Sequence, residues 1–301
     1  MPSLARALVA TVAVGAVVAA VAAGVRHSTA PDPAPSPGVP APPGAGRAEA
    51  APERRMEPAD GPRLSAPADP IRVPGASLFG WTLLDHITGA MAGSANSATV
   101  TNTVESMIKP WIAADHLRRL ADDDRRPTRA ALDELTLMIV DSHDPAAEKY
   151  FHLGGTDAVT RRLVSVCDLD RVRMVSAKWS FTEMTPRDAA RYGRCLADGR
   201  AAGPEWTVWI LDTMKKVRGD VGDQVSNEVQ GGRWGIIDGL PPELAREVAI
   251  KNGWTSYVDG WHVNCLAVHP EWTLAVMLRM ATLRAAAKAC EEVAKALVVD
   301  A

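Results

Sequence analysis

The strongest constraint on this chain is a change of hydrophobic pattern along its C-terminal three quarters. Two β-type runs, 78–85 and 90–94, come first, with a turn between them. Helical patterns follow at 106–120, 127–141, 145–163 (with a break at the Gly pair 154–155), 186–197 and 206–217. Short β-type runs then return at 232–237, 246–251, 261–268 and 272–279, before an Ala-rich helix at 281–297. Segregated strands and helices indicate an α+β domain, with the N-terminal strands most simply joining the C-terminal ones in one antiparallel sheet.

The N-terminal quarter has a different composition and is not expected to belong to that domain. Arg6 is followed by an unbroken apolar stretch from Ala7 to Val25, which predicts a secretory signal or an uncleaved membrane anchor within residues 1–30. Residues 31–72 are rich in Pro, Ala and Gly with few large apolar side chains, so they are interpreted as a disordered linker. The folded domain is therefore expected at 73–301, secreted or extracytoplasmic, monomeric, and in contact with a membrane only through the N-terminal segment.

Charge and cysteine content narrow the class further. The formal net charge is −3 and no basic stripe is present, so nucleic-acid binding is disfavoured. The four cysteines are Cys167, Cys195, Cys265 and Cys290. In an exported protein a cysteine pair usually forms a disulfide, and Cys167–Cys195 is the expected one because each borders a connection. Cys265 and Cys290 lie within a strand and a helix pattern, where buried free thiols are common.

Three short motifs carry the chemistry. Ser106 and Lys109 form an S-x-x-K at the start of a helical pattern, which places the hydroxyl and the amine on one face. The second motif, in a loop before Pro145, is Ser142-His143-Asp144, and the third, at a strand end, is Lys251-Asn252-Gly253. Each motif alone is common, but S-x-x-K, S-D-N and K-T-G in this order form the signature of penicillin-binding proteins and class A β-lactamases.

From about Leu78 to its end, the chain thus resembles the serine β-lactamase and penicillin-binding-protein superfamily, and class A enzymes most. The segment Thr-Glu-Met-Thr-Pro at 182–186 also resembles the threonine–proline helix entry of class A enzymes. The resemblance implies a three-layer sandwich, with an antiparallel sheet flanked by terminal helices and a helical subdomain. It implies a small-molecule or peptide substrate, β-lactam-like or peptidoglycan-like, and no cofactor.

The resemblance also implies roles for individual residues. Ser106 would form the acyl-enzyme, Lys109 would deprotonate it, and Ser142 would relay a proton to the leaving nitrogen. Lys251 would bind the substrate carboxylate and polarise Ser142, while the N–H groups of Ser106 and Trp254 would form the oxyanion hole. The remaining candidate substrate-binding residues are Asp144, Asn252, Gly253 and Thr255.

Departures from the family pattern shift the expected activity. His143 and Asp144 stand where Asp and Asn are usual, and Asn252 stands where Thr or Ser is usual. The stretch before 185–186 is short and lacks the Glu-x-x-Leu-Asn that carries the deacylating glutamate of class A enzymes. Asp168 and Asp170 are the carboxylates in that neighbourhood, and neither lies in a matching motif. Slow release of the acyl group is therefore expected.

Several alternatives stay open at this point. The loop 142–144 also fits a helix N-cap before Pro145, and His143 is a second candidate for acid–base chemistry. His262, Cys265 and His269 do not predict a metal site, because His262 and Cys265 would point to opposite faces of a strand. The leading prediction is a serine hydrolase or acyltransferase. The alternatives are a D,D-peptidase or transpeptidase acting on peptidoglycan stem peptides, and a penicillin-binding-like sensor or binding module.

Overall fold

The computed structural model describes residues 62–175, 177–226 and 231–299. The expected export segment (1–30) and most of the expected linker (31–72) lie outside these residues. Within them, no helix is long and apolar enough to cross a membrane.

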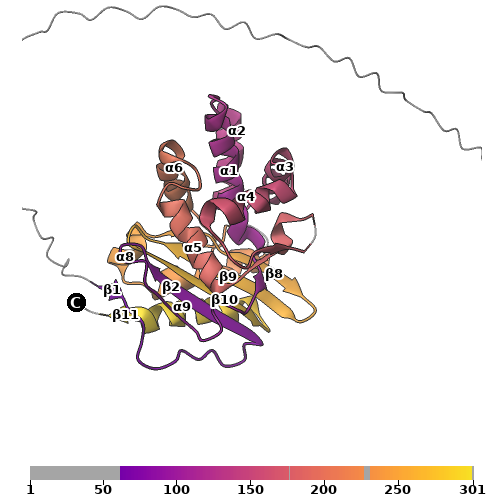
Figure 1. The fold of residues 1–301 in the computed structure, drawn as a ribbon. Coiled ribbons are helices and arrows are strands. Elements are labelled where there is room, and N and C mark those ends of the chain that lie inside the picture. Colours follow the sequence, from indigo (N-terminus) through magenta and orange to yellow (C-terminus); the bar gives the residue numbers. More distant parts are fainter. Residues whose placement is uncertain (1–61, 176, 227–230, 300–301) are drawn as a thin grey trace, which may run out of the picture. The chain divides into compact units, whose positions relative to one another are not determined.

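The centre of the domain is an antiparallel sheet that combines strands from both ends of the chain (Figure 1). Its strands are β2 (Leu78–Asp85), β3 (Met91–Gly93), β7 (Ala249–Ile250), β8 (Gly253–Tyr257), β9 (Gly260–Val268) and β10 (Trp272–Met280). The order is β3-β2-β10-β9-β7, and β8 also pairs with β9. Strand β10 pairs with β2 in a register that runs from Trp272 opposite Asp85 to Arg279 opposite Leu78. The N-terminal hairpin therefore joins the C-terminal strands, as the sequence predicts.

Helices cover both faces of this sheet and give three layers. The C-terminal helix α9 (Leu283–Leu297) packs on one face together with the 3₁₀ turn η3 (Gly235–Gly239), and α5 (Pro186–Ala197) packs against β2, β9 and β10. Cys265 and Val268 of β9 are an odd number of residues apart, so their side chains point to opposite faces of the sheet. Cys265 is disulfide-bonded to α9 on one face, and Val268 approaches α5 on the other. The resemblance implies that terminal helices flank the sheet. Within the described residues, the C-terminal helix α9 fills that role.

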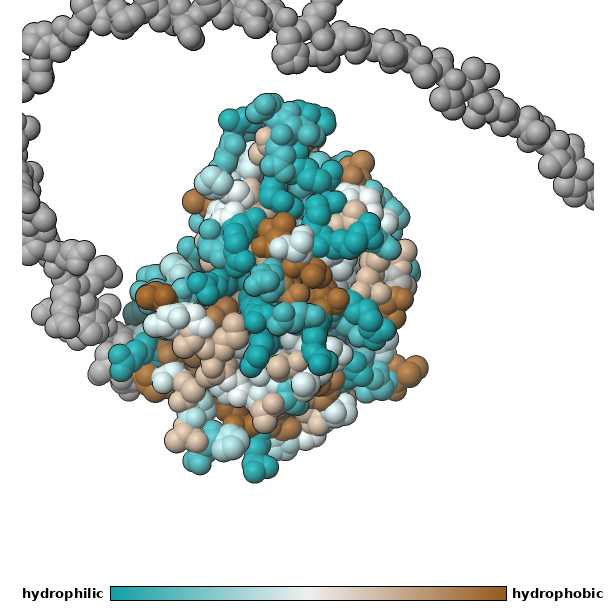
Figure 2. Space-filling view, viewed as in Figure 1, coloured by the Kyte–Doolittle hydropathy of each residue, from teal (hydrophilic) through white to brown (hydrophobic). Residues whose placement is uncertain are grey.

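The helical subdomain is inserted between β3 and β7 and projects above the sheet (Figure 1). The helices of this subdomain are η1 (Glu105–Ile108), α1 (Lys109–Asp122), α2 (Arg129–Val140), α3 (Asp144–Leu153), α4 (Asp157–Cys167) and α6 (Pro204–Met214). The buried helix α1 lies in contact with α2, α3, α4, α5 and α6. A small sheet, β4 (Asn102–Thr103), β6 (Thr182–Met184) and β5 (Arg173–Met174), joins this subdomain to the base, and the turn η2 (Trp179–Phe181) precedes β6. On the face in Figure 2, the projecting end is hydrophilic and the hydrophobic side chains show as small separate patches.

Two of the expected boundaries are wrong. The expected strand at 232–237 is a loop that ends in η3, because Gly232 and Gly235 have φ near +85°, a left-handed conformation that strands do not use. Residues 246 and 247 of the next expected strand (246–251) belong instead to α8 (Pro242–Glu247), which leaves β7 short.

The ordered domain also begins before Val73. Strand β1 (Arg63–Leu64) pairs with β11 (Val298–Val299), and Leu64 and Ile71 pack on the core. These residues belong to the folded unit and not to the linker, because backbone pairing and apolar contacts fix them. The helix α7 (Val221–Ser226) completes the elements of the described residues.

The described residues contain two disulfides. Cys167–Cys195 connects α4 to α5 with a Cα–Cα distance of 5.3 Å, which confirms the expected pair. The expectation of free thiols at Cys265 and Cys290 is wrong, since these residues form a second disulfide between β9 and α9. The pairing follows from the three-layer packing, which brings an inward-facing strand residue against the buried stripe of α9.

We expect the double substitution Cys265→Ala and Cys290→Ala to lower the free energy of unfolding by about 2–4 kcal/mol, since the closed loop restricts the unfolded chain. Urea unfolding without reductant measures this difference. Chemically reduced wild-type protein, which also loses Cys167–Cys195, should be destabilised further. An unchanged unfolding midpoint in the double variant would show that packing alone holds α9 on the sheet.

Candidate active site

The turn that carries Ser106 is fixed between the small sheet and α1. The Val104 N–H donates to Thr182 O at 2.8 Å, and Glu105 adopts φ 51° in the left-handed region. Ser106 lies in η1, and Lys109 is the first residue of α1. Because side chains at i and i+3 eclipse each other in a 3₁₀ turn, both point to the same side. Asn102 and Thr103 form β4, and Val104 occupies the N-cap position of η1 without a side-chain cap.

The Ser142 hydroxyl lies between the two lysines of the flanking motifs. Lys109 Nζ donates to Ser142 Oγ at 3.0 Å and to Ser142 O at 2.5 Å. Lys251 Nζ donates to the same Oγ at 3.1 Å, and to Gly231 O at 3.3 Å. Ser142 itself has φ 56°, which turns its side chain toward both amines at the end of α2. Residues 109, 142 and 251, far apart in sequence, thus form one buried polar cluster.

Burial makes both amines weak bases compared with ordinary lysines. Desolvation lowers the pKa of Lys109 to about 8, while the Asp144 carboxylate opposes that shift. Desolvation, and then the charge of Lys109, hold the pKa of Lys251 well below its usual value. A lysine with a pKa near neutrality can exist as the free amine, which is the form that accepts a proton from a serine hydroxyl.

Asp144 is the first residue of α3 and forms an ion pair with Lys109. Its Oδ1 lies 2.5 Å from Lys109 Nζ, and its side chain is 66% exposed. The cap of α3 is neither Ser142 nor Asp144 but His143, whose Nδ1 accepts from the Ala146 N–H. This capping role directs the His143 ring to α3, so that Ser142 and Asp144 are the motif residues that contact Lys109.

The third motif brings the sheet against the turn that carries Ser106. A methyl group on Gly253 would lie 2.3 Å from Val104 O, 2.7 Å from Met107 N and 2.9 Å from Ser106 N, so only glycine fits there. Asn252, expected to contact substrate, is instead buried and donates from Nδ2 to Gly232 O at 2.9 Å and Trp234 O at 2.8 Å. It anchors the neighbouring loop and does not face the site.

A pocket of about 250 Å³ opens over these residues. It brings together the expected residues Ser106, Ser142, Asp144, Trp254 and Thr255, and is completed by Glu105, Trp179, Ser180, Phe181 and Tyr257. Lys109 and Lys251 lie beneath its surface with no exposed area. Among the described residues, no hydrogen-bond partner occupies the Ser106 hydroxyl.

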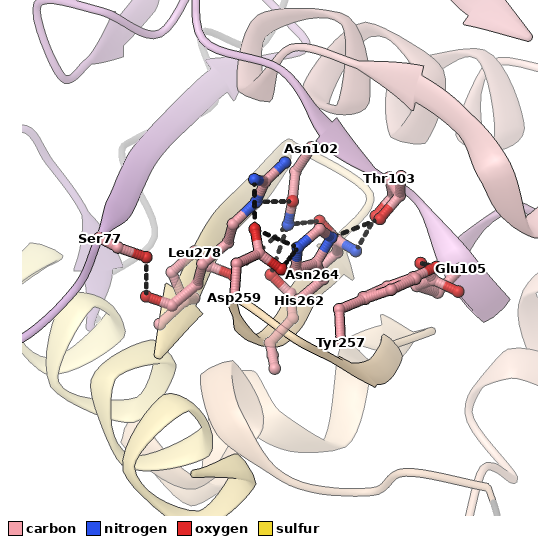
Figure 3. Close-up of polar contacts among 11 residues, drawn as sticks. Ser77, Asn102, Thr103, Glu105, Tyr257, Asp259, His262, Asn264 and Leu278 are labelled. Atoms are coloured by element: carbon pink, nitrogen blue, oxygen red, sulfur yellow. Dashed lines mark hydrogen bonds and ion pairs between the residues drawn. The ribbon is translucent and has the colours of Figure 1, made fainter. Parts of the chain in front are cut away.

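Glu105 is a pocket residue that the sequence motifs do not predict. Its buried carboxylate accepts from Tyr257 OH at 2.9 Å and from Thr255 Oγ1 at 2.8 Å, and burial raises its pKa. Figure 3 shows Glu105 and Tyr257 beside a polar network in which Thr103 Oγ1 and His262 Nδ1 are 2.8 Å apart. Alternation along β8 puts residues 255 and 257 on one face, and this signal could have identified Tyr257.

The short stretch before β6 places an aromatic ring against Lys109. Lys109 Nζ lies 4.8 Å from the centre of the Trp179 ring, and Trp179 Nε1 donates to Glu148 at 3.1 Å. Asp168 and Asp170 lie elsewhere. Asp168 caps the end of α4 in the left-handed conformation, and Asp170 pairs with Arg191 at 2.5 Å. Neither aspartate lines the pocket.

The candidate metal residues noted in the sequence are used otherwise. Cys265 is in a disulfide, His262 lies against Asp259 and Thr103, and His269 lies 3.3 Å from Glu247. Within the described part of the chain, no group of three His, Cys, Asp or Glu side chains could hold a metal ion.

Comparison with known proteins identifies the architecture. No family model and no curated protein matches the chain. Among solved structures, a β-lactamase from Burkholderia vietnamiensis is 17% identical, with a TM-score of 0.56 over 75% of this chain and 90% of that one. The ancestral (GNCA) class A β-lactamase is 18% identical, with a TM-score of 0.55 over 74% and 93%. A β-lactamase from Desulfarculus baarsii is 18% identical, with a TM-score of 0.53 over 72% and 91%. At this identity the likeness establishes the β-lactamase fold.

Proposed function

We propose that this chain is an exported β-lactamase-like serine hydrolase or acyltransferase that forms an acyl-enzyme on Ser106. Its substrate would be an amide, a β-lactam or an envelope peptide. The observation that carries the proposal is the Ser142 hydroxyl held between Lys109 Nζ at 3.0 Å and Lys251 Nζ at 3.1 Å, in the pocket that Ser106 lines.

The geometry supports a division of roles among these groups. In the free-amine form, Lys109 takes the Ser106 proton while Oγ attacks the carbonyl carbon. Ser142, polarised by Lys251, passes a proton to the leaving nitrogen. The close approach of Gly253 brings the strand start at Trp254 to the Ser106 N–H, which suits these two N–H groups for the oxyanion.

Export is part of the proposal. Two disulfides are typical of proteins that fold in an oxidising compartment, and the apolar segment of residues 7–25 has the pattern of an export signal or anchor. The structure does not describe that segment.

Ser106→Ala tests the proposal. Wild-type protein incubated with a fluorescent penicillin should retain a covalent label, seen on a denaturing gel and as a mass increase of one acyl group. The variant should show none, because the attacking oxygen is absent. Ser180→Ala, which removes another pocket hydroxyl, should leave labelling in place.

Related readouts separate the remaining possibilities. Rapid hydrolysis of nitrocefin would indicate a true lactamase, and release of D-Ala from a stem peptide ending in D-Ala-D-Ala would indicate a peptidase. Wild-type protein that never carries a label at any concentration would contradict acyl-enzyme formation and favour a binding module.

A further inference from the structure

Hydrolysis of an acyl-enzyme needs a base that removes a proton from water, and the stretch of chain before β6 contributes Trp179, Ser180 and Phe181 to the pocket but no carboxylate. Trp179 covers Lys109 at the pocket wall. Asp170, in the same stretch of chain, is paired with Arg191 at 2.5 Å outside the pocket. Any base that serves the ester must therefore come from another element.

Two carboxylates of the described residues line the pocket, and they differ in availability. Glu105 is 3% exposed, and each of its oxygens accepts a hydroxyl hydrogen bond, from Tyr257 and Thr255. Asp144 is 66% exposed on its side chain, and one of its oxygens, Oδ1, lies against Lys109 Nζ. Asp144 is the carboxylate that a pocket water can reach while staying anchored by its ion pair.

We propose that Asp144 is the general base that activates the water for hydrolysis of the acyl-enzyme. This inference rests on the proposed acylation of Ser106. In the step, the Asp144 carboxylate takes one water proton as the water oxygen bonds to the ester carbon. The bond between that carbon and Ser106 Oγ then breaks, and Oγ regains a proton from Asp144 through Lys109. The products are a carboxylic acid and the free serine.

The same ion pair gives Asp144 an opposite effect on the first half of the reaction. Its negative charge and its hydrogen bond both favour the ammonium form of Lys109 and raise that lysine's pKa. At pH 7 this leaves only a minor share of Lys109 as the free amine that acylation requires. Removing the charge should therefore speed acylation and slow hydrolysis, a combination that simple structural damage does not produce.

Asp144→Asn tests both effects with a fluorescent penicillin as the probe. We expect label to form up to about tenfold faster at pH 7, because about a tenth of a lysine with a pKa near 8 is neutral at that pH. After excess probe is removed, label should be lost about 10²–10⁴-fold more slowly, the range expected for loss of a positioned general base. Intact mass spectrometry follows both rates, and Asp144→Glu should recover part of the hydrolysis.

The controls separate this inference from the proposed function. Asp170→Asn removes a carboxylate outside the pocket and should change neither rate. If Asp144→Asn loses its label at the wild-type rate, Asp144 is not the base, although the proposed acylation of Ser106 is still supported. The same conclusion follows if Glu105→Gln retains its label and Asp144→Asn does not. If wild-type protein forms no acyl adduct, the proposed function and this inference both fail.

Discussion

Lys109→Met should slow acylation of Ser106 by about 10²–10⁴-fold at pH 8, the range expected for loss of a positioned general base. The wild-type acylation rate should rise with pH and level off above about 8, because burial lowers the pKa of Lys109 to about 8 and only the free amine accepts the serine proton. The variant should lose this rising limb. Stopped-flow measurement of label formation between pH 6 and pH 10 gives both quantities.

The matched control is Lys178→Met, which removes an exposed lysine over the Phe181 ring at the pocket edge. This control should keep the wild-type rate and pH midpoint. Near-UV circular dichroism would check that Lys109→Met is folded. A folded Lys109→Met protein with an unchanged midpoint near pH 8 would contradict the role of Lys109 and point to another titrating group.

The sequence was most informative where local pattern and tertiary packing agree. Helix α5 begins and ends at the expected residues, since Pro186 follows the capping Thr185 and the helix stops before Gly199. The break at residues 154–155 likewise separates α3 from α4. The hairpin at 78–94 and the strands β9 and β10 were also predicted, because short, nearly continuous apolar runs bounded by turn residues fit the strands of a sheet with two covered faces.

The errors arose where long-range contacts decide the outcome. Nothing local in Cys265 or Cys290 indicates a bond, since it depends on which face of β9 meets α9. Asn252 was expected to contact substrate because of its position in the third motif. Its side-chain amide instead donates hydrogen bonds to the carbonyl groups of residues 232 and 234, a contact that depends on how the loop before η3 folds. The start of the domain was placed late because β1 is two residues long and is stabilised by a strand at the opposite end of the chain.

The candidate site shows the same division. The order and spacing of the motifs predicted Ser106, Lys109, Ser142 and Lys251 as candidates, and the structure gathers Lys109, Ser142 and Lys251 into one cluster at the pocket that Ser106 lines. The spacing did not identify Glu105 or Trp179, whose positions depend on how β8 and η2 fold over the pocket. It also gave no reason to couple Asp144 to Lys109, since that contact requires the start of α3 to meet the start of α1.

Gly253→Ala should lower the acylation rate by about 100-fold, although the substitution adds a single methyl group outside the reacting atoms. That methyl would lie 2.3 Å from Val104 O and 2.7 Å from Met107 N, so β8 or the turn that carries Ser106 must move. A displacement of about 1 Å in a catalytic group costs on the order of 10²-fold. Overpacking of this kind also destabilises a fold by about 1–3 kcal/mol, which thermal unfolding would detect.

Ser256→Ala is the control, because it changes an exposed residue of the same strand and should leave both rate and stability unchanged. The pH midpoint near 8 should also persist in Gly253→Ala, since the surroundings of Lys109 are not altered directly. This separates displacement of the Ser106 and Trp254 N–H groups from loss of the base. Acylation of Gly253→Ala at the wild-type rate would show that the contact between β8 and the turn that carries Ser106 does not set the geometry of the oxyanion site. In that case the N–H groups of Ser106 and Trp254 are not the donors to the oxyanion.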